Sequence, residues 1–270
     1  MNILFIGDIV AQAGLDIAAD LMPRIIRDLK IDYCIVNGEN ADMGKGIRRK
    51  DAEKLLSCGA DILTGGNHSF QKNSSIVLKN PLLKTLRPAN YPPDNPGSGY
   101  MLITKKGLNP LAVLNLQGRA FLPPIDCPFR YTDSILPELK SQSKCIFVDF
   151  HAEATAEKQA FAWDFDGKVS IVVGTHTHVQ TADNRILPKG TAYISDVGMT
   201  GAANSVIGMD VDTAIKRFRT QQLKYFKTTN LNPRLNGVFV KLNDQTGKAL
   251  SIERINIDRD EYGSGKIIKR

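Results

Sequence analysis

The chain has 270 residues, a hydrophobic content of 42% and a formal net charge of +7 at pH 7. This length is compatible with one domain, and the hydrophobic content is enough for a sizeable core. No stretch of about 18 uncharged apolar residues occurs, which excludes an ordinary membrane-spanning helix. The first apolar run lacks a basic start and ends at Ile6, so it predicts a strand and not a signal peptide.

The four cysteines form no CxxC pair, and Cys34 and Cys145 fall inside predicted strands, where cysteine behaves as a small hydrophobe. We therefore expect a reducing, cytoplasmic setting. The positive charge favours anionic ligands such as phosphates or RNA. Its densest cluster comes late in the chain, at Lys216, Arg217, Arg219, Lys224 and Lys227. A solvated helix face explains this cluster better than an RNA-binding patch, because no aromatic-rich or glycine-rich RNA motif accompanies it.

Short apolar runs that end in Gly, Asp or Asn predict most of the strands. Eight such runs are Asn2–Ile6, Tyr33–Val36, Asp61–Thr64, Tyr100–Ile103, Leu111–Leu116, Cys145–Phe150, Val169–Val173 and Ala192–Ser195. Two later runs, Gly237–Leu242 and Leu250–Ile257, alternate in character and predict an antiparallel pair.

Apolar residues at helical spacing predict helices between these strands. The first runs from Leu15 to Leu29, and Pro23 is expected to kink it or to start a second helix. The other predicted helices are Arg48–Cys58, Glu153–Trp163 and Val211–Phe226. A loop over 87–99, rich in Pro, Gly and Asn, divides a βα-alternating first part from a more strand-rich second part. Because both parts carry motif residues, we expect residues 1–270 to form one domain.

Polar motifs follow five of the predicted strands. They are Gly7-Asp8-Ile9-Val10, Gly38-Glu39-Asn40, Gly65-Gly66-Asn67-His68, the isolated His151, and Gly174-Thr175-His176-Thr177-His178. All four histidines of the chain lie in these motifs. If the strands are parallel neighbours, the five loops open at one sheet edge, where open α/β sheets place their ligands.

Together the motifs offer two carboxylates (Asp8 and Glu39), two amide oxygens (Asn40 and Asn67) and up to four imidazoles. That set is too large for one tetrahedral zinc ion. It suits two octahedral or five-coordinate ions of the Mn, Fe or Mg kind, with a carboxylate between them. Two such ions, about 3.5–4 Å apart, can bind a phosphate oxygen and lower the pKa of a bridging water. A histidine beside the ions could give a proton to the leaving alkoxide.

Each motif alone has a structural explanation. Asp8 could cap the following helix, and both asparagines could be turn residues. His151 alone would more often be a satisfied core histidine. His176 and His178 alternate in an expected extended segment, so both could face one centre. Four further polar residues are left outside the ligand set: Asp42, Asp149, Asp196 and Asn204.

In this order the motifs resemble the calcineurin-like metallophosphoesterase superfamily over residues 7 to 178. Two departures stand out, because Asp8 lacks the histidine that usually follows two residues later, and Glu39-Asn40 replaces the usual Asp after Gly38. With both changes, the motifs resemble those of one bacterial branch of the superfamily, the YmdB-like phosphodiesterases. The usual Gly-Lys of that branch is Ala11-Gln12 here, which puts a phosphate role for a lysine at that place in doubt.

The resemblance implies a four-layer α/β/β/α sandwich of two mixed sheets, the metallophosphoesterase fold. It implies two metal ions, Fe or Mn by preference with Mg as an option. The first would be held by Asp8, Glu39, Asn40 and His178, and the second by Glu39, Asn67, His151 and His176. His68 would be the general acid. The implied reaction is hydrolysis of phosphodiesters, in particular 2′,3′-cyclic nucleotides, by a metal-bridging hydroxide, and the implied assembly is a homo-oligomer.

Two other functions stay open. A phosphomonoesterase or protein phosphatase would use the same centre on a different substrate. A regulatory nucleic-acid-binding protein would keep the metal site for its structure and bind through the basic cluster at 216–227.

Overall fold

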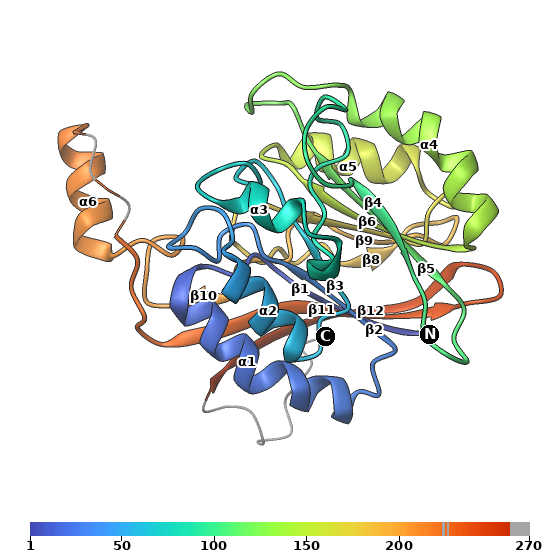
Figure 1. The fold of residues 1–270 in the computed structure, drawn as a ribbon, viewed down its shortest axis with the longest axis horizontal. Coiled ribbons are helices and arrows are strands. Elements are labelled where there is room, and N and C mark those ends of the chain that lie inside the picture. Colours follow the sequence, from blue (N-terminus) through green and yellow to red (C-terminus); the bar gives the residue numbers. More distant parts are fainter. Residues whose placement is uncertain (223–224, 226, 260–270) are drawn as a thin grey trace.

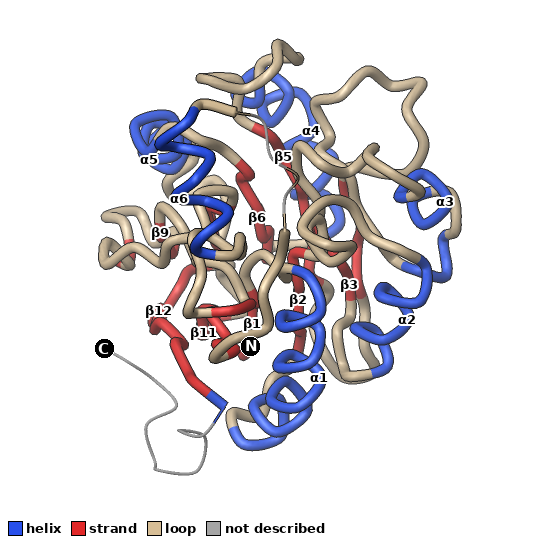
Figure 2. The backbone as a smooth tube through the Cα atoms, turned by 90° about the vertical axis from the view of Figure 1, so that its left-hand side faces the viewer, coloured by secondary structure: helices blue, strands red, loops and turns tan. Residues whose placement is uncertain are grey.

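The computed structural model describes residues 1–222, 225 and 227–259. Within these residues, two six-stranded sheets lie face to face, and helices cover their outer sides (Figure 1). Figure 2 shows α1, α2 and α3 along one outer face, and α4 and α5 along the other. This is the predicted α/β/β/α order, so the predicted fold class is confirmed.

The first sheet combines strands from both ends of the chain. Its strands are β1 (Asn2–Ile6), β2 (Tyr33–Asn37), β3 (Ile62–Thr64), β10 (Gly201–Ala202), β11 (Pro233–Asn243) and β12 (Lys248–Asp258). They follow the order β10-β11-β1-β2-β3, with β12 paired to β11. β1, β2 and β3 run parallel, and β11 runs antiparallel to β1. β11 and β12 are the predicted antiparallel pair, which is thereby confirmed.

The second sheet comes from the middle of the chain. Its strands are β4 (Tyr100–Ile103), β5 (Leu111–Gln117), β6 (Cys145–His151), β7 (Ile171–Thr175), β8 (Arg185–Ile186) and β9 (Ala192–Ile194). Their order is β4-β5-β6-β7-β9-β8, with β5, β6, β7 and β9 parallel and the two edge strands antiparallel. The predicted loop at 87–99 carries the chain from the first sheet to the second.

Helices pack on the outer faces because each turns an apolar side to its sheet. The first sheet is covered by α1 (Ala11–Asp28), α2 (Arg49–Ser57), α3 (Ser74–Leu78) and the 3-10 turn η1 (Pro81–Leu83). The second is covered by α4 (Pro128–Gln142) and α5 (Thr155–Asp164). The last helix, α6 (Val211–Thr220), stands away from both sheets (Figure 1). Among the described helices, none has the length and apolar character that a bilayer crossing requires.

Three helix predictions need correction. Pro23 lies inside α1 and starts no second helix. The helix predicted to reach Phe226 ends at Thr220, because Gln221 turns left-handed with φ 55°; position 226 itself lies outside the described residues. Helix α4 was not predicted, because Pro137 in its middle looks like a helix breaker.

The core between the sheets fixes how the strand ends meet. Phe5 of β1 and Phe147 of β6 are fully buried there, with ring centroids 5.2 Å apart. Cys34 and Cys145 are also buried, and all four cysteines are free thiols. Complete burial of a large apolar side chain such as Phe5 or Phe147 contributes about 1.5–3 kcal/mol to the stability of the fold. The two sheets are therefore firmly joined, and side chains that follow their strands are held at defined positions.

Candidate metal centre

The predicted site residues follow strands of both sheets. Those of the first sheet are Asp8 after β1, Glu39 and Asn40 after β2, and Asn67 and His68 after β3; those of the second are His151 in β6 and His176 and His178 after β7. The expectation of a single sheet edge is therefore wrong. The chain crosses to a second sheet between β3 and β4, so the two groups meet across the gap between sheets.

Four of the predicted residues meet at one nitrogen, His151 Nε2. Asn67 Oδ1 lies 2.9 Å from it, His176 Nδ1 3.0 Å, and Glu39 Oε1 3.1 Å. Glu39, His151 and His176 present ligand atoms within 4.8 Å of one another. These are the residues that the resemblance assigns to the second metal, and each comes from a different strand end or loop.

The residues assigned to the first metal also meet. His178 Nε2 lies 3.3 Å from Asp8 Oδ2 and 3.2 Å from the Asn40 amide nitrogen. That amide also donates to Glu39 Oε1 at 3.2 Å, so Glu39 touches both groups. Asn40 thus presents its NH₂, and a half-turn of the amide would present the oxygen that a cation needs.

Asp8 supplies a test of whether a cation fits. Its Oδ1 is buried and has no hydrogen-bond partner within the described part of the chain. A buried carboxylate oxygen without a partner is costly, because it has lost water and gained nothing in return. A positive ion at this point would remove that cost. The mixed oxygen and nitrogen donors around it are also the ligands that Mn and Fe accept.

The charges in the centre are strongly coupled. Burial raises the pKa of Glu39, but His151 outweighs this and holds it at about 2. Burial opposes charge on His151, yet the Glu39 carboxylate raises its pKa to about 9. Burial and the neighbouring His151 lower the pKa of His176 to about 3. Without a metal, a proton on His151 therefore balances Glu39, and a metal ion can take the place of that proton.

A buried chain of hydrogen bonds fixes the ring of His151. Its Nδ1 lies 2.9 Å from Thr175 Oγ1, which donates to Asp149 Oδ1 at 2.7 Å. The other oxygen of Asp149 accepts from Thr64 Oγ1 and from Asn37 Nδ2. Partners of this kind orient a metal-binding histidine so that its second nitrogen faces the metal. Asp149 thus supports a candidate ligand, as do the two threonines and the asparagine, which were not predicted.

The segment that carries His176 and His178 is not extended, so that prediction is wrong. Strand β7 ends at Thr175, and His176 and His178 have φ values of 101° and 68°. Such left-handed backbone is unfavourable for residues other than glycine and persists where the surroundings impose it. Here Asp196 Oδ2 accepts from the Thr177 amide and hydroxyl, at 3.0 and 2.7 Å.

A cavity of about 280 Å³ opens onto this centre. His68 lines it, donates its backbone N–H to Glu39 Oε2 at 3.1 Å, and leaves its buried Nδ1 without a hydrogen-bond partner among the described residues. Burial lowers the pKa of His68. Two charged lining residues were not predicted, Lys45 and Glu153. Glu153 Oε2 lies 3.0 Å from His176 Nε2, and its position two residues after His151 was the available signal.

Gly66 is required by the space around the centre. A β-carbon at this position would lie 2.3 Å from Glu39 Oε2 and 2.4 Å from His151 Nε2. Atoms that approach so closely must move apart, so any side chain would displace these two residues. The glycine before Asn67 is therefore explained by close packing against Glu39 and His151.

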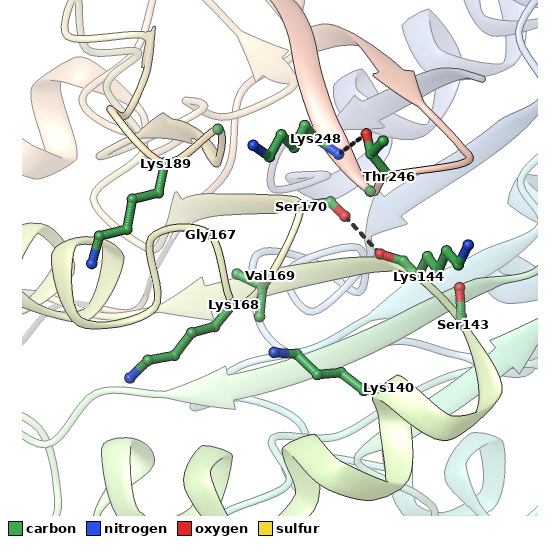
Figure 3. Close-up of a pocket in the computed structure, with 12 residues that line it drawn as sticks. Lys140, Ser143, Lys144, Gly167, Lys168, Val169, Ser170, Lys189, Thr246 and Lys248 are labelled. Carbon is green, nitrogen blue, oxygen red and sulfur yellow. Dashed lines mark hydrogen bonds between the residues drawn. The ribbon is translucent and has the colours of Figure 1, made fainter.

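A second cavity, of about 270 Å³, lies at the opposite ends of β6 and β7. Five lysines from separate segments surround it (Figure 3): Lys140, Lys144, Lys168, Lys189 and Lys248. Its lining contains no carboxylate side chain. The seven residues of β6 separate it from the metal centre by about 20 Å, at roughly 3.3 Å per residue. This cavity therefore belongs to a different part of the surface.

A four-layer sandwich with carboxylate, amide and imidazole groups between the strand ends of its two sheets defines a protein of the metallophosphoesterase class. Comparison with known proteins places the chain more narrowly. It belongs to the family described as YmdB-like protein, whose model matches residues 4–255.

Several relatives cover nearly the whole chain. The 2′,3′-cyclic-nucleotide 2′-phosphodiesterase of Bacillus subtilis (strain 168) is 48% identical over 96% of this chain and 98% of its own. The crystal structure of a hypothetical protein from Thermus thermophilus has a TM-score of 0.89 at 38% identity, covering 96% of this chain and 99% of that one. A phosphatase of Mycoplasma pneumoniae has a TM-score of 0.88 at 36% identity, covering 96% and 93%.

Proposed function

We propose that this protein is a metal-dependent phosphodiesterase that hydrolyses 2′,3′-cyclic nucleotides. The observation that carries the proposal is the convergence of Glu39, Asn67 and His176 on His151 Nε2, each within 3.1 Å. The Bacillus subtilis relative, named for the same activity, supports the choice of substrate.

Two metal ions would occupy the centre. Asp8, Glu39, Asn40 and His178 would hold one, and Glu39, Asn67, His151 and His176 the other. Fe or Mn suits the mixed oxygen and nitrogen donors, and Mg is an option. When bound, such ions would polarise the phosphate oxygens and lower the pKa of a nearby water. The buried, unpartnered oxygen of Asp8 supports a cation beside it.

His68 would be the general acid. It lines the cavity without joining the ligand atoms, and its unpartnered Nδ1 has a proton position to offer. Burial lowers its pKa, but a phosphate anion in the cavity would raise that pKa again and favour the protonated ring. His68 would then protonate the ribose oxygen that departs. Lys45, on the same cavity wall, would attract the phosphate by charge.

Product analysis tests this proposal. Protein loaded with Mn should convert 2′,3′-cyclic AMP to 3′-AMP, because cleavage at the 2′ oxygen leaves the phosphate on the 3′ oxygen. Chromatography separates 3′-AMP from 2′-AMP. The same preparation should hydrolyse bis-p-nitrophenyl phosphate faster than p-nitrophenyl phosphate. A reversed preference, with no cyclic nucleotide consumed, would instead identify a phosphomonoesterase or protein phosphatase.

A second candidate is a regulatory RNA-binding protein with a structural metal site. The lysine-lined cavity supports it, because five positive charges without a carboxylate attract phosphates (Figure 3). RNA binding that falls steeply with salt and survives Asp8→Ala would favour this function. RNA binding that is as weak at low salt as at high salt would exclude this second function.

Two further expectations concern the cellular location of the protein and its domain organisation. We place it in the cytoplasm, because Cys34, Cys58, Cys127 and Cys145 are all free thiols. We also treat residues 1–270 as one domain, because both sheets supply residues to the same centre.

A further inference from the structure

The second cavity, of about 270 Å³, gathers five lysines far from the metal centre (Figure 3). We call it the lysine cavity. Its lysines come from α4, the loop that follows α4, the turn before β7, the turn between β8 and β9, and the first residue of β12. Like charges that gather in one place repel one another, which costs free energy. A negatively charged ligand would offset that cost.

Close backbone packing fixes the turns that carry these lysines. Gly167 and Gly247 both have left-handed backbone, with φ 75°. A β-carbon on Gly247 would lie 2.1 Å from the carbonyl oxygen of Lys144. A β-carbon on Gly167 would lie 2.7 Å from the β-carbon of Lys189. Glycine at these two positions therefore lets the turns approach closely. The backbone holds the lysines near one another, and no attraction between their side chains does so.

The positive charge of the lysine cavity is largely uncompensated. Within the described residues, no carboxylate side chain lines it. Asp244 lines an adjoining hollow, where its Oδ2 accepts from Asn109 Nδ2 at 2.9 Å. Lys168 pairs with Asp164 at 3.2 Å in an exposed contact. In the described part of the chain, the other four lysines make no ion pair. Their charges are therefore available to an anion.

The lysines surround a hollow with a buried inner surface. Ser143, Val169 and Ser170 form that surface, and all three are buried. The five amino groups spread apart in Figure 3 and do not meet at one point. Like charges in water separate in this way. Each ammonium group is carried by a flexible four-carbon stem, so it can turn toward an anion that enters the hollow.

The size and lining of the cavity favour a small ligand over a nucleic acid. Ligand sites are usually about 300 Å³ or more, so a cavity of about 270 Å³ suits a small molecule. Sites for single-stranded RNA combine positive charge with aromatic rings that stack on the bases. The described lining contains no aromatic side chain. One phosphate group carries about two negative charges at most. Two or three linked phosphates therefore match the lysines better than one.

We propose that the lysine cavity binds small molecules through a diphosphate or triphosphate group. The unpaired ammonium groups close around the phosphate oxygens, and charge-assisted hydrogen bonds hold them there. The phosphate group itself is recognised, whether it is free pyrophosphate or part of a nucleotide. The seven residues of β6 separate this site from the metal centre by about 20 Å, at roughly 3.3 Å per residue. The proposal is independent of the proposed function, since no metal ion and no ester cleavage enter it.

Isothermal titration calorimetry with inorganic pyrophosphate tests the site. The wild-type protein should bind pyrophosphate at low salt, and its affinity should fall as salt is added. Lys189→Gln combined with Lys248→Gln should weaken binding by at least about tenfold, because two charged contacts are lost. The metal centre is unchanged in this variant, so the difference reports on the lysine cavity.

The matched control is Lys50→Gln combined with Lys79→Gln. Both lysines are exposed and lie beside the first sheet, in α2 and directly after α3. This variant loses the same net charge and should bind pyrophosphate as the wild type does. A wild type that binds no pyrophosphate, or a control that loses as much affinity as the cavity variant, would overturn the proposal.

Asp8→Ala separates the lysine cavity from the metal centre. Pyrophosphate should still bind to this variant, and circular dichroism checks that the variant is folded. Wild-type protein stripped of metal with a chelator gives the same comparison without a substitution. Pyrophosphate binding that disappears in both would place the ligand at the metal centre and overturn the proposal. Loss of cyclic-nucleotide hydrolysis in Asp8→Ala bears on the proposed function alone.

Other phosphates define the group that is recognised. ADP should bind about as tightly as pyrophosphate, while AMP and inorganic phosphate should bind at least about tenfold more weakly, because they bring fewer charges. Equal affinity for inorganic phosphate and pyrophosphate would exclude recognition of a diphosphate group. An RNA oligonucleotide that depends on Lys189 and Lys248 and is not displaced by pyrophosphate would assign the cavity to RNA and overturn the proposal.

Discussion

Glu39 contacts members of both groups of candidate ligands. Its Oε1 lies 3.1 Å from His151 Nε2 and accepts from Asn40, while its Oε2 accepts from the His68 backbone. It is almost fully buried. A carboxylate in this position can serve two ions at once, and no neighbouring side chain can replace it.

We therefore expect Glu39→Ala to lose metal. Elemental analysis of the purified variant should give a clearly lower metal-to-chain ratio than wild type, and hydrolysis should be lost with it. Glu53→Ala is the control, because Glu53 is exposed and its ion-pair partner is Arg49 at 2.7 Å, on the same helix; it should keep full metal. Full metal content and a normal rate in Glu39→Ala would refute the shared role.

His68→Ala should have the opposite outcome. The ring of His68 lies outside the ligand atoms, so the variant should keep its metal. Turnover should fall by about 10²–10⁴-fold, the usual contribution of a general acid. Elemental analysis and steady-state rates on one preparation separate the two effects. A metal-free His68→Ala protein would show that this histidine is a ligand.

For single residues, the sequence predicted which side chains meet, but not which contacts hold them in position. The residue types and their order after strands pointed to the two carboxylates, the two asparagines and the four histidines, and the family resemblance then divided them into seven candidate ligands and one candidate acid. The left-handed backbone of His176 and His178 depends on Asp196, a residue far along the chain that no local pattern reveals. The same holds for Glu153, which contacts His176 through the fold and not through a motif.

Among the elements, α5 and the loop after β9 share a buried ion pair that supports the centre. Lys158 Nζ lies 2.8 Å from Asp196 Oδ2, and both side chains are about 2% exposed. The same carboxylate holds Thr177, which lies between the two histidines. Removing one member would leave the other as an unpaired buried charge.

We expect Lys158→Met to destabilise the protein by about 3–5 kcal/mol, the usual cost of breaking a buried ion pair. Urea unfolding measures this change. Lys168→Met is the control, because its pair with Asp164 at 3.2 Å is exposed and should contribute less than about 1 kcal/mol. Adding Asp196→Asn to Lys158→Met should restore part of the loss. A loss no greater than that of the control would show that the buried pair does not stabilise the fold.

The strands were easier to predict than the helices, for a physical reason. Strands such as β1 and β6 are buried on both faces and appear as short apolar runs. Helix α4 also shows helical spacing, with Thr132, Leu136 and Leu139 buried, but Pro137 argued against predicting a helix there. A proline is tolerated there in the tertiary structure, and that context cannot be read from the local sequence.

For the whole molecule, the division of the site between two sheets is the main feature. The first sheet supplies Asp8, Glu39, Asn40 and Asn67, and the second supplies His151, His176 and His178. A metal ion bound here would link the sheets. The fold class was implied by the family resemblance that the five motifs carry, since the strand count only permitted it. The pairing of β11 with β1, which closes the first sheet, had no signal in the sequence.

Metal removal should therefore lower the thermal stability. Binding to the folded state at a hundredfold excess over Kd stabilises by about 2.7 kcal/mol. Protein treated with a chelator should unfold at a lower temperature in calorimetry, and added Mn should restore the higher value. Glu39→Ala should show no response to Mn. An identical unfolding temperature with and without a filled centre would contradict a link between the sheets.

The crossover at 87–99 also has a consequence for synthesis. The carboxylates and amides at positions 8 to 67 leave the ribosome while the imidazoles at 151 to 178 have not yet been made. A nascent chain thus lacks three of the seven candidate donors until positions 151, 176 and 178 have been made. A complete centre would therefore form late, and a truncated product that stops before position 151 would compete poorly for metal ions.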